Sequence, residues 1–270
     1  MIEPFKHSNE SHIHIEKWKK LNPKLKAGFT VRNGGVSKPP FDTLNGGLHV
    51  QDEYDDVIEN RTILSNHLRI PLENWVLGEQ THQTNIQAVT AKDKGKGAIS
   101  YQNSLKDTDG LITNCEGILC TAFFADCVPL YFFDPKSGYI GIAHAGWRGS
   151  VNRIAEKMVQ KLDEAGVNPT DLLVTIGPCI TQKAYEVDEK VINHIHVQDR
   201  KNTVISNGNN RYLLDLKQLN VEILLQCGVI RNNIDVTNYC TFNDNALFFS
   251  HRRDNGQTGR MLGFLGYECS

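Results

Sequence analysis

The feature that most constrains this chain is a pair of apolar segments, at residues 128–133 and 139–143, joined by a turn. Each segment has the length and composition of a buried β-strand. The residues between them read Asp-Pro-Lys-Ser-Gly, a sequence typical of a tight turn. We therefore predict an antiparallel hairpin. Cys127 precedes its first strand and His144 follows its second, so a thiol and an imidazole should lie close together at the open end.

Apolar residues elsewhere predict one further strand, over 117–124, and three helices. The helices are expected from Val57 to just before Pro71, from a cap at Ser150 to a stop at Gly166, and from a cap at Asp215 to Gly228. Because hairpin-paired strands lie between scattered helices, we predict an α+β fold rather than a strict βαβ series. No repeat or low-complexity linker marks a boundary, so we predict a single catalytic domain over 1–270.

The composition is that of an ordinary globular protein without a strong charge. The 270 residues are 40% hydrophobic and 22% charged, with a formal net charge of −2 and a pI near 6.5. This balance predicts no nucleic-acid partner and no attraction to an anionic membrane. Residues 1–7 lack the basic and apolar regions of a signal peptide, and no segment approaches the roughly 18 apolar residues of a membrane span. We therefore expect a cytoplasmic protein.

The seven cysteines do not form a recognisable framework. They lie at positions 115, 120, 127, 179, 227, 240 and 269. Their number is odd and they contain no Cys-x-x-Cys pair, which argues against both a disulfide scaffold and a structural zinc ribbon. We expect most of them to be small buried side chains in the reduced state.

Cys127 and His144 gain a third candidate partner in His82. Two histidines and one cysteine are a known ligand set for zinc that leaves a fourth position open, and an open position is typical of a catalytic site. Taken singly, a buried cysteine usually packs and a histidine usually satisfies a hydrogen bond. Their combination predicts either a metal site or a Cys/His nucleophile.

The segment 146–150, Gly-Trp-Arg-Gly-Ser, predicts an anion site beside these residues. Its glycines open a predicted helix, whose first N–H groups are free to bind an anion. Arg148 adds a planar guanidinium suited to phosphate or carboxylate. The alternatives are an ordinary surface cation for Arg148 and core packing for Trp147.

Two acids are candidates for a supporting or catalytic role. Asp109 and Asp126 could each orient a ligand or act as a general acid or base. We favour Asp126, which is adjacent to Cys127, and we assign to it the protonation of a leaving group.

Two His-x-His pairs, at 12–14 and 194–196, are similar to those of copper oxidases. A trinuclear copper site needs about four such pairs, and a blue copper site needs a nearby methionine. The three methionines, at 1, 158 and 261, are not so placed. We expect both pairs to face solvent.

Eight short motifs occur in this chain in the same order as in a known family. They are RNGGVS at 32–37, NGGLHV at 45–50, QTH at 80–82, DGL at 109–111, ADCVP at 125–129, HAGWRG at 144–149, GPCI at 177–180 and FSHRRD at 249–254. Over roughly residues 27–264 the chain resembles the multicopper-oxidase-like laccase-domain family, also called the polyphenol oxidase or peptidoglycan-editing-factor family.

The resemblance implies a fold, a cofactor and an activity. The fold is a layered α-β-β-α sandwich similar to toxin-like cysteine hydrolases. The cofactor is Zn²⁺ held by His82, Cys127 and His144. The activity is phosphorolysis of adenosine, inosine, guanosine or methylthioadenosine, with phosphate as co-substrate, together with deamination of adenosine to inosine. Arg148, Gln80 and Asn45 are expected to bind substrate.

Three alternatives remain. A metal-free hydrolase would use Cys127 as nucleophile, His144 as base and His82 as the residue that orients the base. A peptidoglycan-editing factor of the cell envelope would bind a muropeptide or a partner instead of turning over nucleosides. Copper-dependent oxidation of phenols ranks last, for the reasons given for the His-x-His pairs.

Overall fold

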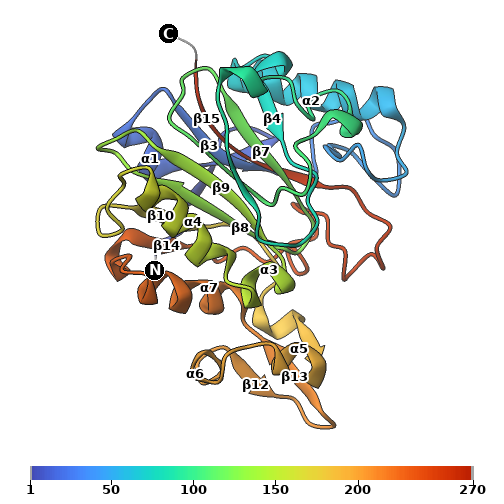
Figure 1. Ribbon diagram of the computed structural model, residues 1–270. Coiled ribbons are helices and arrows are strands. Elements are labelled where there is room, and N and C mark those ends of the chain that lie inside the picture. The colour runs from blue at the N-terminus through green and yellow to red at the C-terminus, as the bar shows by residue number, and fades with distance from the viewer. Residues whose placement is uncertain (1, 269–270) are drawn as a thin grey trace.

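The computed structural model describes residues 2–268, and most of their strands form two six-stranded sheets (Figure 1). In spatial order, the first sheet contains β1 (Phe5–His7), β2 (His12–Ile15), β3 (Leu25–Thr30), β15 (Met261–Tyr267), β7 (Leu119–Phe124) and β4 (Trp75–Leu77). The second contains β14 (Ile234–Val236), β10 (Leu173–Ile176), β8 (Val128–Phe133), β9 (Ile140–Ala145), β6 (Gly110–Thr113) and β5 (Ile86–Ala88).

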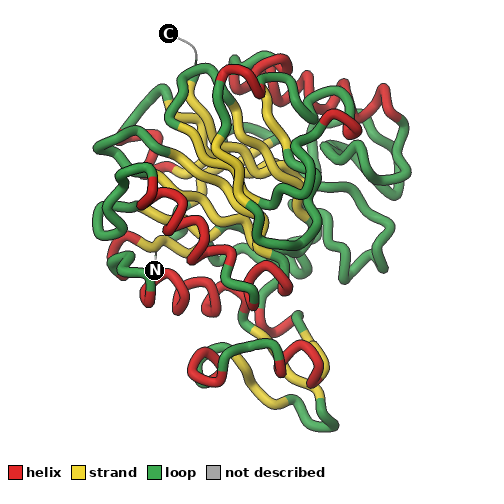
Figure 2. The backbone as a smooth tube through the Cα atoms, in the orientation of Figure 1, coloured by secondary structure: helices red, strands yellow, loops and turns green. Residues whose placement is uncertain are grey.

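Helices lie around these sheets (Figure 2). They are α1 (Glu16–Leu21), α2 (Tyr54–Leu68), α3 (Trp147–Val151), α4 (Ile154–Glu164), α5 (Glu189–Asn193), α6 (Val197–Arg200) and α7 (Leu216–Gln226), with 3-10 turns at Leu72–Asn74, Ala91–Asp93, Tyr101–Asn103, Gln182–Ala184 and Arg231–Asn233. Within residues 2–268, every helix is too short or too polar to cross a membrane.

The predicted hairpin is present as β8 and β9, which pair antiparallel along their whole length. Both faces of β8 are buried. Leu130 and Phe132 pack in an apolar cluster with residues of α4 and α7, whereas Tyr131 and Phe133 pack in a second cluster with residues of the first sheet. This double burial explains why the segment is apolar at every position rather than alternating.

Most pairings within the sheets are antiparallel, but β4 with β7, β5 with β6 and β10 with β14 are parallel. The chain is therefore a mixed α/β fold with several sheets. A third sheet, of β11 (Glu186–Asp188), β13 (Arg211–Leu214) and β12 (Val204–Ser206), protrudes with α5 and α6 at one end of the molecule (Figure 1). The likeness to toxin-like hydrolases stays a prediction.

Two of the three predicted helices have the expected ends. Helix α2 ends at Leu68, before Pro71. Helix α7 begins after Asp215, whose side chain accepts a hydrogen bond from the backbone N–H of Gln218 at 2.9 Å. Both ends were encoded locally, by a proline and by a capping carboxylate.

The predicted cap at Ser150 is wrong. Ser150 lies inside α3 and is fully buried, and its hydroxyl accepts a hydrogen bond from Asn220 Nδ2 at 2.9 Å. Helix α4 starts only at Ile154, after Arg153 adopts a left-handed conformation with φ 63°. One continuous helical pattern is therefore divided into two helices, and the serine joins α3 to α7 instead of capping.

Six of the seven cysteines belong to the described residues, and all six are free thiols. Cys120, Cys179 and Cys240 are buried, and the other three are half-buried. Cys269 lies outside the described residues, as does Met1.

Candidate metal centre

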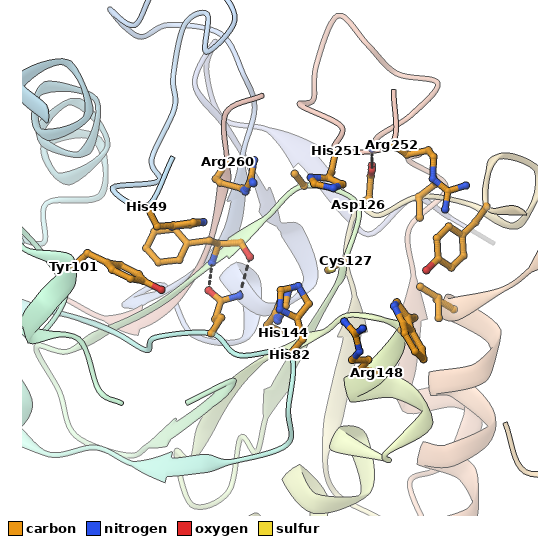
Figure 3. A pocket seen from close by; sticks show the side chains of 17 residues that line it. His49, His82, Tyr101, Asp126, Cys127, His144, Arg148, His251, Arg252 and Arg260 are labelled. Atoms are coloured by element: carbon orange, nitrogen blue, oxygen red, sulfur yellow. Dashed lines mark hydrogen bonds between the residues drawn. The ribbon is translucent and has the colours of Figure 1, made fainter. Parts of the chain in front are cut away.

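His82, Cys127 and His144 come together at the open end of the β8–β9 hairpin (Figure 3). One ligand atom from each lies within 4.8 Å of the other two. The two imidazole rings are nearly perpendicular, at 85°, with their centroids 4.7 Å apart. The closeness of Cys127 and His144 that the hairpin predicts is confirmed. Across residues 2–268, no other three His, Cys, Asp or Glu side chains meet the same spacing.

This donor set fits a tetrahedral divalent metal. Two imidazoles at about 2.1 Å and a thiolate at about 2.3 Å from a zinc ion would lie roughly 3.5 Å apart, and the three ligand atoms in the structure all lie within 4.8 Å of one another. His144 offers Nε2, because its Nδ1 hydrogen-bonds with Asp109. His82 is exposed, so solvent can reach the centre, and three ligands would leave a fourth position for water or substrate. Two histidines and a thiolate with one open position are typical of a catalytic zinc site.

Asp109, just before β6, holds both histidines in place. Its Oδ1 lies 2.8 Å from His144 Nδ1 and accepts the backbone N–H of His82 at 3.1 Å. Its Oδ2 accepts the backbone N–H groups of Thr81 and Gln83 at 3.0 and 2.9 Å. These bonds fix the left-handed backbone of His82, with φ 61°, and the tautomer of His144.

Asp126 has a different task from the one that the sequence favoured. It is buried, and its carboxylate accepts hydrogen bonds from Thr241 Oγ1 at 2.6 Å, Ser250 Oγ at 3.0 Å and the backbone N–H of Arg252 at 2.7 Å. The acid that orients a ligand is therefore Asp109, not Asp126. Asp126 instead joins the β7–β8 turn to the segment that carries Arg252.

The electrostatics of the centre favour a thiolate beside an imidazolium. Burial raises the pKa of Cys127, but His144 and His82 more than offset this and lower it to about 6. Burial likewise lowers the pKa of His144, but Cys127 and Asp109 more than offset this and raise it to about 9. A pre-formed thiolate suits both metal ligation and nucleophilic attack.

Replacing Gly146 with alanine should weaken metal binding. Its φ of −64° suits any residue, so the effect would be steric: an added Cβ would lie 3.1 Å from Cys127 Sγ and 3.1 Å from His82 Cδ2. We expect a loss of about 10- to 100-fold in metal affinity, measured by competition with a chromogenic chelator. An unchanged affinity in a folded variant would show that these two side chains do not converge on one ion.

A cavity of about 430 Å³ surrounds the centre, and its lining differs on the two sides (Figure 3). On one side the ring of His49 lies 5.4 Å from that of Tyr101 and 4.8 Å from that of Phe123. On the other side Arg148 and Arg252 extend from different segments. The three candidate ligands lie between these two sides. We call the side with His49, Tyr101 and Phe123 the aromatic wall, beside which Arg260 also lies, and the side with Arg148 and Arg252 the cationic wall.

Arg148 lies where the sequence placed an anion-binding group. It is exposed within the cavity, and its guanidinium lies 4.7 Å from the ring centroid of Trp147. Helix α3, to which Arg148 belongs, has only five residues, so the guanidinium rather than a helix dipole supplies most of the positive charge. Trp147 is half-buried, lines the cavity and also packs against the apolar core cluster of α4 and α7.

Arg61 of α2 packs against the aromatic wall, with its guanidinium 5.4 Å from the ring centroid of Phe123. It is fully buried, and its guanidinium donates hydrogen bonds to the carbonyls of Gly46 at 2.7 and 2.9 Å and of Gly97 at 2.7 Å. Burial lowers its pKa to about 9, so it remains a cation at neutral pH. Its bonds tie together the two loops that carry His49 and Tyr101.

Gln80 and Asn45 make structural contacts. Gln80 lines the cavity, but its amide pairs with the backbone of Phe123, donating to the carbonyl at 3.0 Å and accepting the N–H at 2.7 Å. Asn45 is fully buried outside the cavity lining, and its Oδ1 accepts the backbone N–H of Arg260 at 2.9 Å. Substrate contact is therefore not supported for Asn45, which instead positions Arg260.

Several residues of the cavity were not assigned from the sequence. They are His49, Tyr101, Phe123, Tyr185, His251, Arg252 and Arg260. The motifs at 45–50 and 249–254 contain three of them and could have pointed to a site. The other four lie outside every motif and reach the cavity only through the tertiary fold.

The two His-x-His pairs do not lie at this centre. His194 and His196 are exposed, as expected. The expectation that His12 faces solvent is wrong, because it is only 6% exposed and lies against Phe264 of β15, with ring centroids 5.7 Å apart.

Comparison with known proteins places the chain among relatives that match most of its length. A family model described as multi-copper polyphenol oxidoreductase laccase matches residues 26–268. The chain is 42% identical over 269 residues to purine nucleoside phosphorylase YlmD of Bacillus subtilis, with 97% of each chain covered. It is 44% identical over 244 residues to the Geobacillus stearothermophilus protein of the same name, with 89% of each covered. A crystal structure of the Bacillus licheniformis hypothetical protein YfiH matches with a TM-score of 0.95 and 41% identity, covering 99% of this chain and 100% of that one. These matches confirm the resemblance carried by the eight motifs: the chain belongs to the laccase-domain family.

Proposed function

We propose that this protein is a zinc-dependent purine nucleoside phosphorylase that also deaminates adenosine. Adenosine, inosine, guanosine and methylthioadenosine are the proposed nucleosides, and phosphate is the co-substrate. The relatives named purine nucleoside phosphorylase support an enzyme of this class. The observation that carries the proposal is the cavity, in which a His-Cys-His metal set lies between an aromatic wall and a cationic wall. Six free thiols are consistent with the reducing cytoplasm.

The aromatic wall suits the purine base. Tyr101 and Phe123 both line the cavity, and stacking of a base on an aromatic ring is worth about 1–3 kcal/mol. The protein around His49, together with Arg260 and Arg61, lowers the pKa of His49, so this ring is neutral at working pH. A neutral imidazole can donate or accept a hydrogen bond at the edge of a purine.

The cationic wall suits phosphate. The guanidinium of Arg148 is held over Trp147, and that of Arg252 lies 5.0 Å from the ring centroid of Tyr185 and donates to the carbonyl of Glu186 at 2.9 Å. These contacts leave other N–H groups of each guanidinium free to bind an oxyanion. Two such groups can hold phosphate beside the ribose.

In phosphorolysis, a phosphate oxygen forms a bond to ribose C1′ while the bond from C1′ to the purine breaks. The electron pair of that bond leaves with the base, which then takes up a proton. Positive charge develops on the ribose, and the phosphate held by Arg148 and Arg252 is the nearby anion that stabilises it. A zinc ion bound by His82, Cys127 and His144 would supply a Lewis acid at its open position. Asp126 accepts three hydrogen bonds, so we assign to it the positioning of Arg252 rather than proton transfer.

The direct test is incubation of the purified, metal-assayed protein with adenosine, with and without phosphate, followed by mass spectrometry. Adenine and ribose 1-phosphate that appear only with phosphate would establish phosphorolysis. Inosine formed without phosphate would establish deamination. A folded, zinc-loaded sample that forms neither product would reject the proposed function and favour a hydrolase or an envelope role.

Replacing Arg148 with methionine should reduce phosphorolysis more than deamination. Methionine keeps an apolar stem on Trp147 and removes the charge. The loss of a charge-assisted hydrogen bond, about 1.5–3 kcal/mol, predicts a kcat/KM for phosphate about 10- to 100-fold lower. Arg211→Met, on an exposed strand outside the cavity, is the matched control. Equal losses of both activities in Arg148→Met would argue against phosphate binding by this residue.

A second candidate is a metal-free cysteine hydrolase, which one specific arrangement favours. The thiol of Cys127 lies beside His144, whose Nδ1 is 2.8 Å from Asp109, as in a Cys-His-Asp triad. This enzyme would be inactivated by alkylation and unaffected by chelators. The proposed phosphorylase would lose activity with a chelator and regain it with added zinc.

A further inference from the structure

A second cavity, of about 260 Å³, lies on the first sheet where β2, β3 and α1 meet the end of α2. It shares no lining residue with the cavity of the metal centre. Its polar lining is rich in basic side chains: His12, His14, Lys19, Lys26 and His67. Carboxylates do not line it, as far as the described residues go. Nothing in the proposed nucleoside chemistry uses this site.

The charges around the cavity are only partly balanced. His14 Nε2 lies 2.8 Å from a carboxylate oxygen of Glu16, and Lys26 Nζ lies 2.8 Å from one of Glu268. Lys19 and the other two histidines have no acidic partner within 4.0 Å in the described part of the chain. The unbalanced charge is therefore positive, and it increases whenever one of these histidines takes up a proton.

Ser11 orients the rings of His12 and His67. Its hydroxyl donates to Asn9 Oδ1 at 2.8 Å and lies 3.0 Å from Nδ1 of each ring. A hydroxyl that has used its single hydrogen can only accept, so both rings carry their proton on Nδ1. Neither Nε2 atom hydrogen-bonds with any residue of the described range. Each Nε2 atom thus carries a lone pair when its ring is neutral, and it becomes a free N–H donor when the ring is protonated.

We propose that this cavity is a pH-dependent binding site for a phosphate group, either inorganic phosphate or a small phosphomonoester. The ligand is held by the protonated Nε2 atoms of His12 and His67 and by the ammonium group of Lys19. Cationic donors on three separate elements, β2, α2 and α1, converge on one cavity that no acid lines. The volume leaves room for a sugar-sized substituent on the phosphate.

Binding and protonation are coupled at this site. Burial and the nearby positive groups, which are His67, His14, Lys19 and Lys26, lower the pKa of His12 to about 4. On the far side of the ring lies Phe264, which carries no charge. An anion in the cavity would reverse the effect of these cations, so binding takes up a proton and becomes stronger as the pH falls from 8 towards 6. Without the anion, the lowered pKa destabilises the fold progressively as the pH falls from about 6.5 to about 4, because in this range His12 is protonated mainly in the unfolded chain.

The test follows the imidazole signals of the full chain by NMR from about pH 4 to pH 8. One titration contains inorganic phosphate, and the other contains chloride at the same ionic strength. His12→Asn and His67→Asn assign the two signals. We expect phosphate to raise the pKa of His12 by about 1 to 3, the effect of an opposite charge in contact. Ribose 5-phosphate in a third titration shows, by a larger or smaller rise, whether the monoester or the free ion fits better.

Two variants separate this site from the metal centre. Lys19→Gln removes an exposed cation and should reduce the rise in the pKa of His12 without affecting folding. Arg148→Met removes a cation from the other cavity and should leave the rise intact. The proposal is overturned if phosphate leaves the pKa of His12 unchanged in the folded protein. It is also overturned if the rise disappears in Arg148→Met and persists in Lys19→Gln.

Discussion

Replacing His82 with alanine should abolish nucleoside turnover and remove the bound metal. His82 supplies one of three ligand atoms within 4.8 Å of one another, and the remaining Cys127 and His144 cannot hold a catalytic ion alone. Changes to residues that merely support a ligand cost about 10- to 100-fold in affinity or activity, so loss of a ligand should exceed this. Metal content by atomic emission and product formation by mass spectrometry measure the two effects together.

His196→Ala is the matched control for that experiment. His196 is an exposed histidine outside the cavity lining, and its removal should leave metal content and turnover unchanged. Undiminished turnover in a folded, metal-free His82→Ala protein would remove the metal from the mechanism. That outcome would favour the cysteine hydrolase, because the pair of Cys127 and His144 is intact in this variant.

The β8–β9 hairpin, which carries Cys127 and His144 at its open end, was predictable because the residues that specify it are close together in sequence. Apolar segments of strand length, separated by Asp134 to Gly138, specify antiparallel pairing whatever the rest of the chain does. Pairing of β8 with β9 then brings Cys127 and His144 together without further information. His82 could be added only by its chemistry, since nothing local shows that its loop reaches the hairpin.

The failures share a cause: side chains whose partners are remote in sequence. Ser150 has the sequence context of a helix cap, but its partner is Asn220 on another helix. His12 looks like an exposed position on a short strand, but Phe264 and His67 cover it. In both cases contacts made by the tertiary fold override what the neighbouring sequence favours, which is a helix cap at Ser150 and an exposed side chain at His12.

The choice between Asp126 and Asp109 failed for the same reason. Adjacency to Cys127 favoured Asp126, but Asp126 lies in the β7–β8 turn with φ 83°, and its carboxylate accepts hydrogen bonds from Thr241 and Ser250 instead. Asp109 precedes β6, and β6 pairs with β9, which places the carboxylate beside His144. Only knowledge of which strands pair could have made that assignment. The sequence thus identified Asp109 as a candidate, but it could not show that Asp109 rather than Asp126 orients His144.

Replacing Asp109 with asparagine should damage both the metal centre and the fold. Asp109 is only 2% exposed and accepts bonds from His144 Nδ1 and from three backbone N–H groups. Both carboxylate oxygens of Asp109 face N–H donors. Asparagine has the same shape, but its NH2 group would replace one of these oxygens and face donors that it cannot accept from. Unsatisfied buried N–H groups cost about 1–3 kcal/mol of unfolding free energy. Loss of the orienting carboxylate should lower metal affinity about 10- to 100-fold.

Asp107→Asn distinguishes these effects from a general change of charge in the same loop. Asp107 is exposed and accepts hydrogen bonds from the side chains of Thr81 and Asn85. The Asp107→Asn substitution therefore removes one carboxylate from the same loop without removing a hydrogen-bond partner of His144. Chemical denaturation and chelator competition on both variants separate stability from metal affinity. If Asp109→Asn lost stability but bound metal normally, the backbone of the His82 loop would be what Asp109 holds, and His144 would keep its tautomer without it. If metal affinity fell as expected while Asp107→Asn stayed normal, the carboxylate would be established as the residue that orients His144 towards the metal.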